Sequence, residues 1–114
     1  MGLSLEEYEV KEFEPWELLP APCQAIIAVE CAKESKAAEI ISQVSHKETM
    51  LRFETEREVI RLLGADCTVP VGAYSEINGE KISLTVSDGR GHFAQGEKEI
   101  EKRFELVKEL TDKL

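Results

Sequence analysis

Two different spacings of hydrophobic residues divide this chain into a helical part and a β-rich part. Between Ser35 and Gly64 the apolar residues recur every three or four positions, which is typical of helices that bury one face. The pattern predicts a first helix that begins after Ser35, a good N-cap residue, and is broken near His46-Lys47. It predicts a second helix over 47–63 that stops at Gly64.

The β-rich part is predicted to be an antiparallel meander. Two turn dipeptides, Asn78-Gly79 and Asp88-Gly89, mark tight hairpins, because these residues tolerate a positive φ. Strands are expected at about 69–76, 81–87 and 91–95. From 99 to 114 the helical spacing returns and predicts an amphipathic helix that packs on the core, with five apolar residues on one face: Ile100, Phe104, Val107, Leu110 and Leu114.

Together these elements predict an α+β fold, in which a three-stranded antiparallel sheet carries about three helices on one face. This domain is expected to span residues 32–114. Residues 24–31 form a continuous apolar run of strand length, which is typical of a strand covered on both faces in a parallel sheet. No partner strand for such a sheet is evident near it, so the pattern alone does not explain this segment.

The charge balance excludes several classes of partner. The net charge is −9 and the chain has few arginines, whereas nucleic acids and anionic membranes require clustered Lys and Arg. The longest apolar run, residues 25–29, is too short to span a bilayer. Three cysteines, an odd number, with no signal peptide ahead of them favour a reducing compartment, so we expect a cytoplasmic protein.

Cys67 is the best candidate for a reactive residue, because it lies on a short polar turn where a thiol can be reached. The alternative is that it is a small buried hydrophobic residue. A Cys–His nucleophile pair with His46 or His92 is geometrically possible but has no local signature. The cysteines and histidines also lack the spacing of a zinc site, so we predict no metal.

Charged residues crowd the second predicted helix and are interpreted as an ordinary solvated face. They are Arg52, Glu54, Glu56, Arg57, Glu58 and Arg61.

Three segments resemble porphobilinogen deaminases (hydroxymethylbilane synthases) in order and spacing. They are LPAPCQAIIAVEC over 19–31, Glu56-Arg57, and CTVPVGAY over 67–74. The end of the second predicted strand, LTVSDG over 84–89, is similar too. The resemblance runs nearly end to end along this chain but covers only the C-terminal part of that family's chain.

The resemblance implies that Cys67 holds a dipyrromethane cofactor through a thioether, and that four porphobilinogen units add in sequence to its free end. It also implies that Gln24 binds substrate. It explains residues 1–31 as a remnant segment and strand of an upstream α/β domain, so the expected partners are the N-terminal domains, in cis or as a split subunit. A strand without its sheet also favours a homodimer. The family's catalytic aspartate and arginine-rich cleft lie upstream, so no catalytic residue is assigned and this chain alone is expected to be inactive.

This sequence departs from the family pattern at four positions. The family usually has glycine where Cys23 and Ala25 flank the glutamine, and two glycines where Ala65-Asp66 precede the cysteine. These departures motivate an alternative, a stand-alone interaction or regulatory module that retains the fold without the chemistry.

Overall fold

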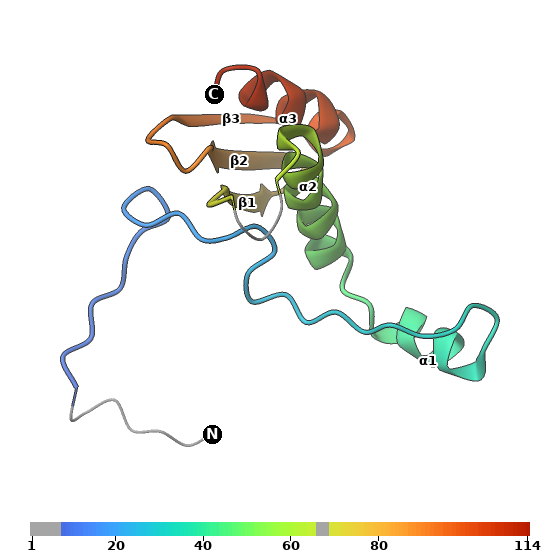
Figure 1. Cartoon of the computed structure of the whole chain (residues 1–114). Helices are drawn as coiled ribbons and strands as arrows, with labels where there is room; N and C mark the ends of the chain where they lie inside the picture. The colour runs from blue at the N-terminus through green and yellow to red at the C-terminus, as the bar shows by residue number, and fades with distance from the viewer. Residues whose placement is uncertain (1–7, 66–68) are drawn as a thin grey trace.

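This computed structural model describes residues 8–65 and 69–114, which contain a three-stranded sheet, three α-helices and a long segment before the first helix (Figure 1). The helices are α1 (Lys36–Val44), α2 (Lys47–Leu63) and α3 (Arg103–Thr111), and a 3-10 turn over Ile100–Lys102 leads into α3. The strands are β1 (Gly72–Asn78), β2 (Lys81–Ser87) and β3 (Phe93–Glu99). The predicted α+β class is confirmed.

The sheet is an antiparallel meander in the order β1-β2-β3. Asn78 pairs with Lys81, so the first turn has two residues, and Gly79 supplies the positive φ of 64° that it needs. The second connection is longer than a tight hairpin, because Ser87 pairs with Phe93. The third strand therefore begins two residues later than the sequence pattern predicts and continues to Glu99.

The longer connection is held by the side chain of Asp88. Its Oδ1 accepts hydrogen bonds from the backbone N–H groups of Arg90, at 2.8 Å, and His92, at 3.2 Å, and its Oδ2 lies 2.7 Å from His92 Nδ1. The His92 side chain and these backbone N–H groups lower the pKa of Asp88 to about 2. The loop is thus closed on itself around one carboxylate.

The hydrophobic core lies between the sheet and two helices, α2 and α3. Alternate residues of β2 point into it, which is the period expected of a strand with one covered face. Gly96 on β3 leaves room for α3, because a Cβ there would lie 3.0 Å from a Leu106 methyl. The buried apolar side chains are Val59, Val71, Ala73, Ile82, Leu84, Val86, Ala94, Leu106, Val107 and Leu110.

The ends of α2 agree with the predicted range, and the residue before it, His46, is an N-cap that the pattern did not indicate. His46 was interpreted as a helix breaker, and its Nδ1 accepts a hydrogen bond from the Thr49 N–H at 3.3 Å. Ser35 caps α1 as expected, with Oγ 3.2 Å from the Ala38 nitrogen. Gly64 ends α2 in the left-handed conformation, with φ 59°.

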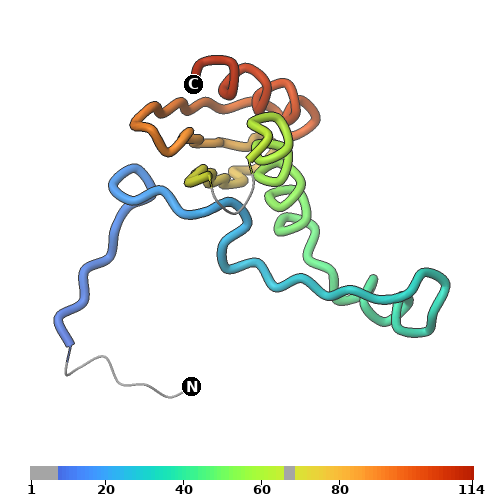
Figure 2. Tube along the Cα trace, in the orientation of Figure 1, coloured from blue at the N-terminus to red at the C-terminus, as the bar shows by residue number. Residues whose placement is uncertain are grey.

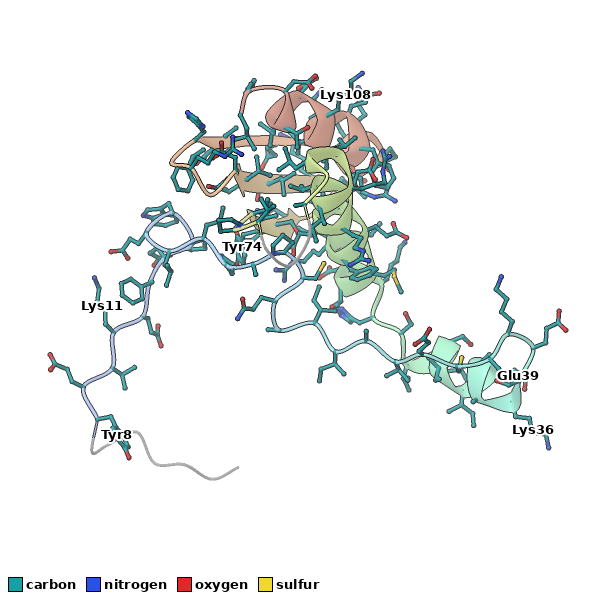
Figure 3. The ribbon with its side chains drawn as sticks, in the orientation of Figure 1. Tyr8, Lys11, Lys36, Glu39, Tyr74 and Lys108 are labelled. Carbon is teal, nitrogen blue, oxygen red and sulfur yellow. The ribbon has the colours of Figure 1, made fainter. Side chains whose placement is uncertain are left out.

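Helix α1 extends away from the sheet and buries none of its residues (Figures 1 and 2). Its apolar residues Ile40 and Val44 are 65% and 74% exposed. Lys36 and Glu39 mark this outlying helix in Figure 3. The radius of gyration is 16.3 Å, larger than the roughly 13 Å expected for a compact domain of this length. Among the described residues, α2 and α3 are the helices that pack on the sheet, and the apolar stripe of α1 is exposed.

Residues 24–31 form no strand, so the strand expected there is not present in this structure. A strand requires the N–H and C=O groups of a neighbour, and β1 to β3 are the strands of the described residues. Ile27 and Val29 are 91% and 64% exposed. Among the described residues, the helices are all too short or too polar to cross a membrane.

Candidate functional site

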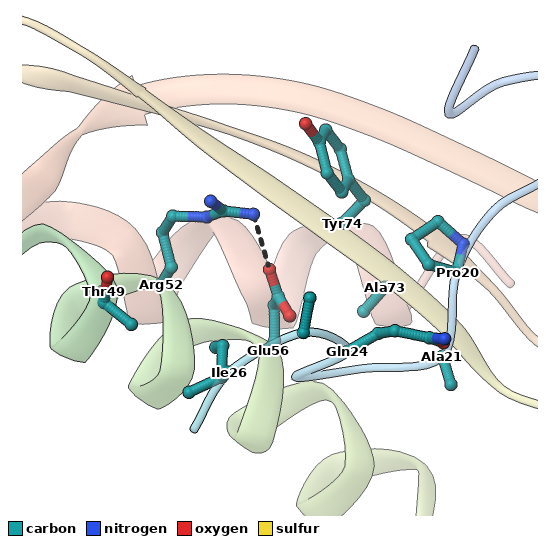
Figure 4. A pocket seen from close by; sticks show the side chains of 10 residues that line it. Pro20, Ala21, Gln24, Ile26, Thr49, Arg52, Glu56, Ala73 and Tyr74 are labelled. Atoms are coloured by element: carbon teal, nitrogen blue, oxygen red, sulfur yellow. Dashed lines mark ion pairs between the residues drawn. The ribbon is translucent and has the colours of Figure 1, made fainter. Parts of the chain in front are cut away.

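The described residues before α1, 8–34, are called the N-terminal segment. A hollow of about 300 Å³ opens beside β1, where this segment passes the first half of α2 (Figure 4). The segment comes from a part of the sequence that the resemblance singles out, and it brings Gln24 to this place. Side chains from α2 and β1 complete the walls. The lining residues are Pro20, Ala21, Gln24, Ala25, Ile26, Thr49, Arg52, Glu56, Ala73 and Tyr74.

The N-terminal segment is attached to β1 by one backbone hydrogen bond and one close contact. The Ala73 N–H donates to the Pro20 carbonyl at 3.1 Å. Leu19 lies against Gly72, where an added Cβ would be 2.7 Å from a Leu19 methyl. Only glycine allows this approach without a shift. Two of the segments that resemble the same family, 19–31 and 67–74, are therefore in contact.

Glu56 lies inside the structure, and its interpretation as part of a solvated face is wrong. Its side chain is almost completely buried at the junction of α2, β1 and the N-terminal segment. Its Oε1 accepts hydrogen bonds from Ser75 N–H, at 3.0 Å, and Ser75 Oγ, at 2.6 Å. Its Oε2 accepts a hydrogen bond from the Cys23 N–H at 2.7 Å. The run of charges gave no sign that this one carboxylate turns toward the sheet, and the Glu56-Arg57 resemblance was the only available signal.

Arg52 lies one helical turn before Glu56 on the same wall. Its Nη2 is 3.9 Å from Glu56 Oε1, the ion pair drawn in Figure 4, and its guanidinium carbon is 5.4 Å from the centroid of the Tyr74 ring. The Tyr74 hydroxyl donates to Glu76 at 2.8 Å, and this bond raises the pKa of Tyr74. The Arg52 side chain therefore reaches from α2 to Tyr74 on β1.

Gln24 lies between two residues with the backbone conformation of glycine. Cys23 has φ 64° and Ala25 has φ 63°, and residues with a Cβ rarely adopt this region. These are the two positions where the resemblance leads us to expect glycine. The Cys23 thiol is 3.8 Å from the Phe53 carbonyl oxygen, and burial, followed by the nearby Glu56, raises its pKa. Both residues thus adopt a conformation that favours glycine although each carries a Cβ.

We expect Ala25→Gly to stabilise the chain. Relief of the left-handed conformation gains roughly 1 kcal/mol, and the extra freedom of glycine in the unfolded chain offsets part of this gain. The net increase in the free energy of unfolding, measured with urea, should be about 0.5 kcal/mol. Ala21→Gly is the matched control, since this exposed alanine of the same segment has no positive φ. An equal gain in both variants would contradict the prediction.

The structure places Gln24, the predicted substrate-binding residue, in the hollow with Arg52 and Glu56. Cys67, the predicted cofactor-binding residue, and Asp66 lie outside the described residues. The chain on either side of them is fixed. The Ala65 N–H donates to the Ile60 carbonyl at 3.0 Å, and Pro70 contacts Gly89.

The two histidines of the sequence have local roles at Nδ1. His46 caps α2, and His92 bonds to Asp88. Within residues 8–65 and 69–114, no three side chains of His, Cys, Asp or Glu gather as metal ligands would.

Comparison with known proteins identifies the family. The family model for the porphobilinogen deaminase C-terminal domain matches residues 50–114. The chain is 36% identical to a porphobilinogen deaminase of Clostridium kluyveri over 88% of its length, and 36% identical to one of Desulforamulus reducens over 92%. It is 35% identical to a probable porphobilinogen deaminase of Methanocaldococcus jannaschii over 100% of its length.

The matched part is a minority of each relative. The chain covers 33%, 36% and 42% of these three proteins, respectively. The family model covers α2 from Met50 onward, the sheet and α3, and it includes the segment 67–74 but not the segment 19–31. The chain therefore belongs to the porphobilinogen deaminase family and contains its C-terminal domain.

Proposed function

We propose that this chain is the C-terminal, cofactor-carrying part of a hydroxymethylbilane synthase, a transferase of tetrapyrrole (porphyrin) biosynthesis. In this proposal Cys67 holds dipyrromethane through a thioether. When bound, this group supplies the primer onto which four porphobilinogen units are condensed. The observation that carries the proposal is the match of residues 50–114 to the family's C-terminal domain, because Cys67 lies within it.

The described residues around Cys67 suit a tether. A thiolate is a strong nucleophile for a carbon electrophile at neutral pH. Before the cysteine, α2 ends at Gly64 in a left-handed cap, and after it Pro70 contacts Gly89 in the second loop of the sheet. The residues on both sides of Cys67 are thus attached to the packed domain. This supports a fixed attachment point for the pyrrole chain that the proposal places on Cys67.

The remaining parts of the reaction are assigned to the N-terminal domains, in cis or as a split subunit. No segment of these 114 residues resembles the family's catalytic aspartate or its arginine-rich cleft, so we propose that this chain alone is inactive. The exposed residues Ile27 and Val29 support a contact with those domains, since they offer an unpaired apolar run. The competing proposal is that the same apolar residues contact a second copy of this chain in a homodimer.

Intact mass spectrometry tests the proposal. The chain is produced with the N-terminal part of a porphobilinogen deaminase, and we expect a mass increase of two pyrrole units that maps to Cys67 by peptide analysis. Cys67→Ser should remain unmodified, whereas Cys31→Ser, which removes an exposed cysteine, should load normally.

The second candidate is a stand-alone interaction module that has lost the chemistry. The observation that favours it is the replacement of the expected glycines by Cys23, Ala25, Ala65 and Asp66. An unmodified Cys67 in the experiment above, together with no turnover of porphobilinogen, would support this module and exclude the synthase.

A further inference from the structure

The carboxylate of Glu56 joins three segments that are far apart in the sequence. It belongs to α2, it accepts two hydrogen bonds from Ser75 on β1, and it accepts one from the backbone of Cys23. The group is 3% exposed. A buried carboxylate is costly unless its oxygens are bonded, and here both oxygens have donors.

Glu56 accepts a hydrogen bond from the free edge of β1, the edge that does not pair with β2. The N–H groups of Ala73 and Ser75 point away from β2, and their acceptors do not belong to a neighbouring strand. The first donates to the Pro20 carbonyl and the second to Glu56 Oε1. The second carboxylate oxygen then binds the Cys23 N–H, so one side chain links the strand edge to the N-terminal segment.

The attachment of the N-terminal segment ends close to Gln24. Beyond Cys23, the Ile26 N–H donates to the Cys23 carbonyl at 3.3 Å, which is a contact within the segment. Residues 27–34 make no backbone–backbone hydrogen bond to the rest of the described chain, and the Ala32 carbonyl accepts one bond from the nearby Ser35 Oγ. Gln24 follows directly after the last residue whose backbone is bonded to the domain.

We propose that Glu56 is a positioning residue for Gln24. Its carboxylate fixes the Cys23 N–H at the edge of β1 and thereby sets the direction in which Gln24 enters the hollow beside Arg52. The consequence for catalysis rests on the proposed function, in which Gln24 contacts substrate. The attachment itself is independent of that function and can be measured on this chain.

Amide hydrogen exchange of the chain, followed residue by residue by NMR, tests the attachment. Glu56→Ala should accelerate exchange at Cys23 by about tenfold to a hundredfold, as expected for a lost hydrogen bond to a charged acceptor. Glu56→Gln keeps one acceptor oxygen and should retain protection at one of the two sites, Cys23 or Ser75. Exchange at Leu84 in the core reports whether the variant is folded.

Glu54→Gln is the matched control. Glu54 lies on the same helix but bonds to Arg103 at 2.7 Å, outside the hollow, so exchange at Cys23 should not change. If Glu56→Ala does not fold, Glu56→Asp provides the same comparison, because its carboxylate is one methylene short of both partners. Unchanged exchange at Cys23 in a folded Glu56 variant would overturn the proposal.

Turnover of porphobilinogen by the chain assembled with the N-terminal domains tests the link to Gln24. If Glu56 acts through Gln24, the double variant Glu56→Ala/Gln24→Ala should be no slower than Gln24→Ala alone. Multiplied defects would overturn the positioning role. A wild-type assembly without turnover would instead refute the proposed function, and hydrogen exchange would still decide whether Glu56 holds the segment.

Discussion

Replacement of Gly89 by alanine should destabilise the chain by roughly 2–5 kcal/mol. Gly89 has φ 70°, a conformation that costs an alanine about 1–2 kcal/mol. The added Cβ would lie 2.6 Å from Pro70 Cγ and 2.8 Å from the Pro70 carbonyl carbon, with the carbonyl oxygen nearer still. Backbone atoms cannot move aside as a side-chain tip can, so overpacking adds a further 1–3 kcal/mol.

Gly79→Ala separates the two contributions to this loss. Gly79 has nearly the same φ, 64°, but nothing lies within 4 Å of its added Cβ. Its loss should be about 1 kcal/mol, from the backbone conformation alone. Urea unfolding of both variants measures the difference, and equal losses would show that the Gly89–Pro70 contact is not close in solution.

Leu84→Ala should cost about 2–5 kcal/mol of unfolding free energy. Leu84 lies on the central strand β2, is 1% exposed, and pairs with Ser75 on one side and Gly96 on the other. Neither neighbour can fill the space that the side chain leaves, because both are small and Gly96 is covered by α3. The cavity should therefore remain open.

Thr85→Ala is the control for Leu84→Ala. Thr85 is the next residue of β2, points to the opposite face and is half-buried. Its replacement should cost no more than about 1 kcal/mol, the usual range for strand preference. The midpoint of urea unfolding should fall much further for Leu84→Ala, at the same slope. Similar midpoints would mean that Leu84 is not a core residue.

The helices and strands of the C-terminal domain could be predicted because their signals are local. Helix α2 has the predicted range, since Gly64 ends it and its apolar spacing is regular. The strand pattern gave β1 and β2 within a few residues. Phe104 was expected on the core face of α3, but it is 44% exposed and Leu106 is buried instead. Spacing alone does not distinguish two adjacent faces of a short helix.

The site depends on contacts that no local pattern records. Glu56 resembles its charged neighbours in the sequence, and its burial follows only from the position of Ser75 in the folded sheet. Gln24 was found through the resemblance, whereas Arg52 and Tyr74 were not identified as wall residues. The strand expected over 24–31 depends on neighbours that the pattern of this chain cannot supply.

The hydrogen bond between Glu56 and position 23 has a consequence for sequence variation. The donor is the backbone N–H, which every residue except proline possesses. A change of side chain at this position therefore leaves the bond in place and is limited by the left-handed φ and by the space beside Phe53. Cys23 therefore makes the same bond that a glycine there would make, whereas the three hydrogen bonds at position 56 are accepted by the side-chain carboxylate itself.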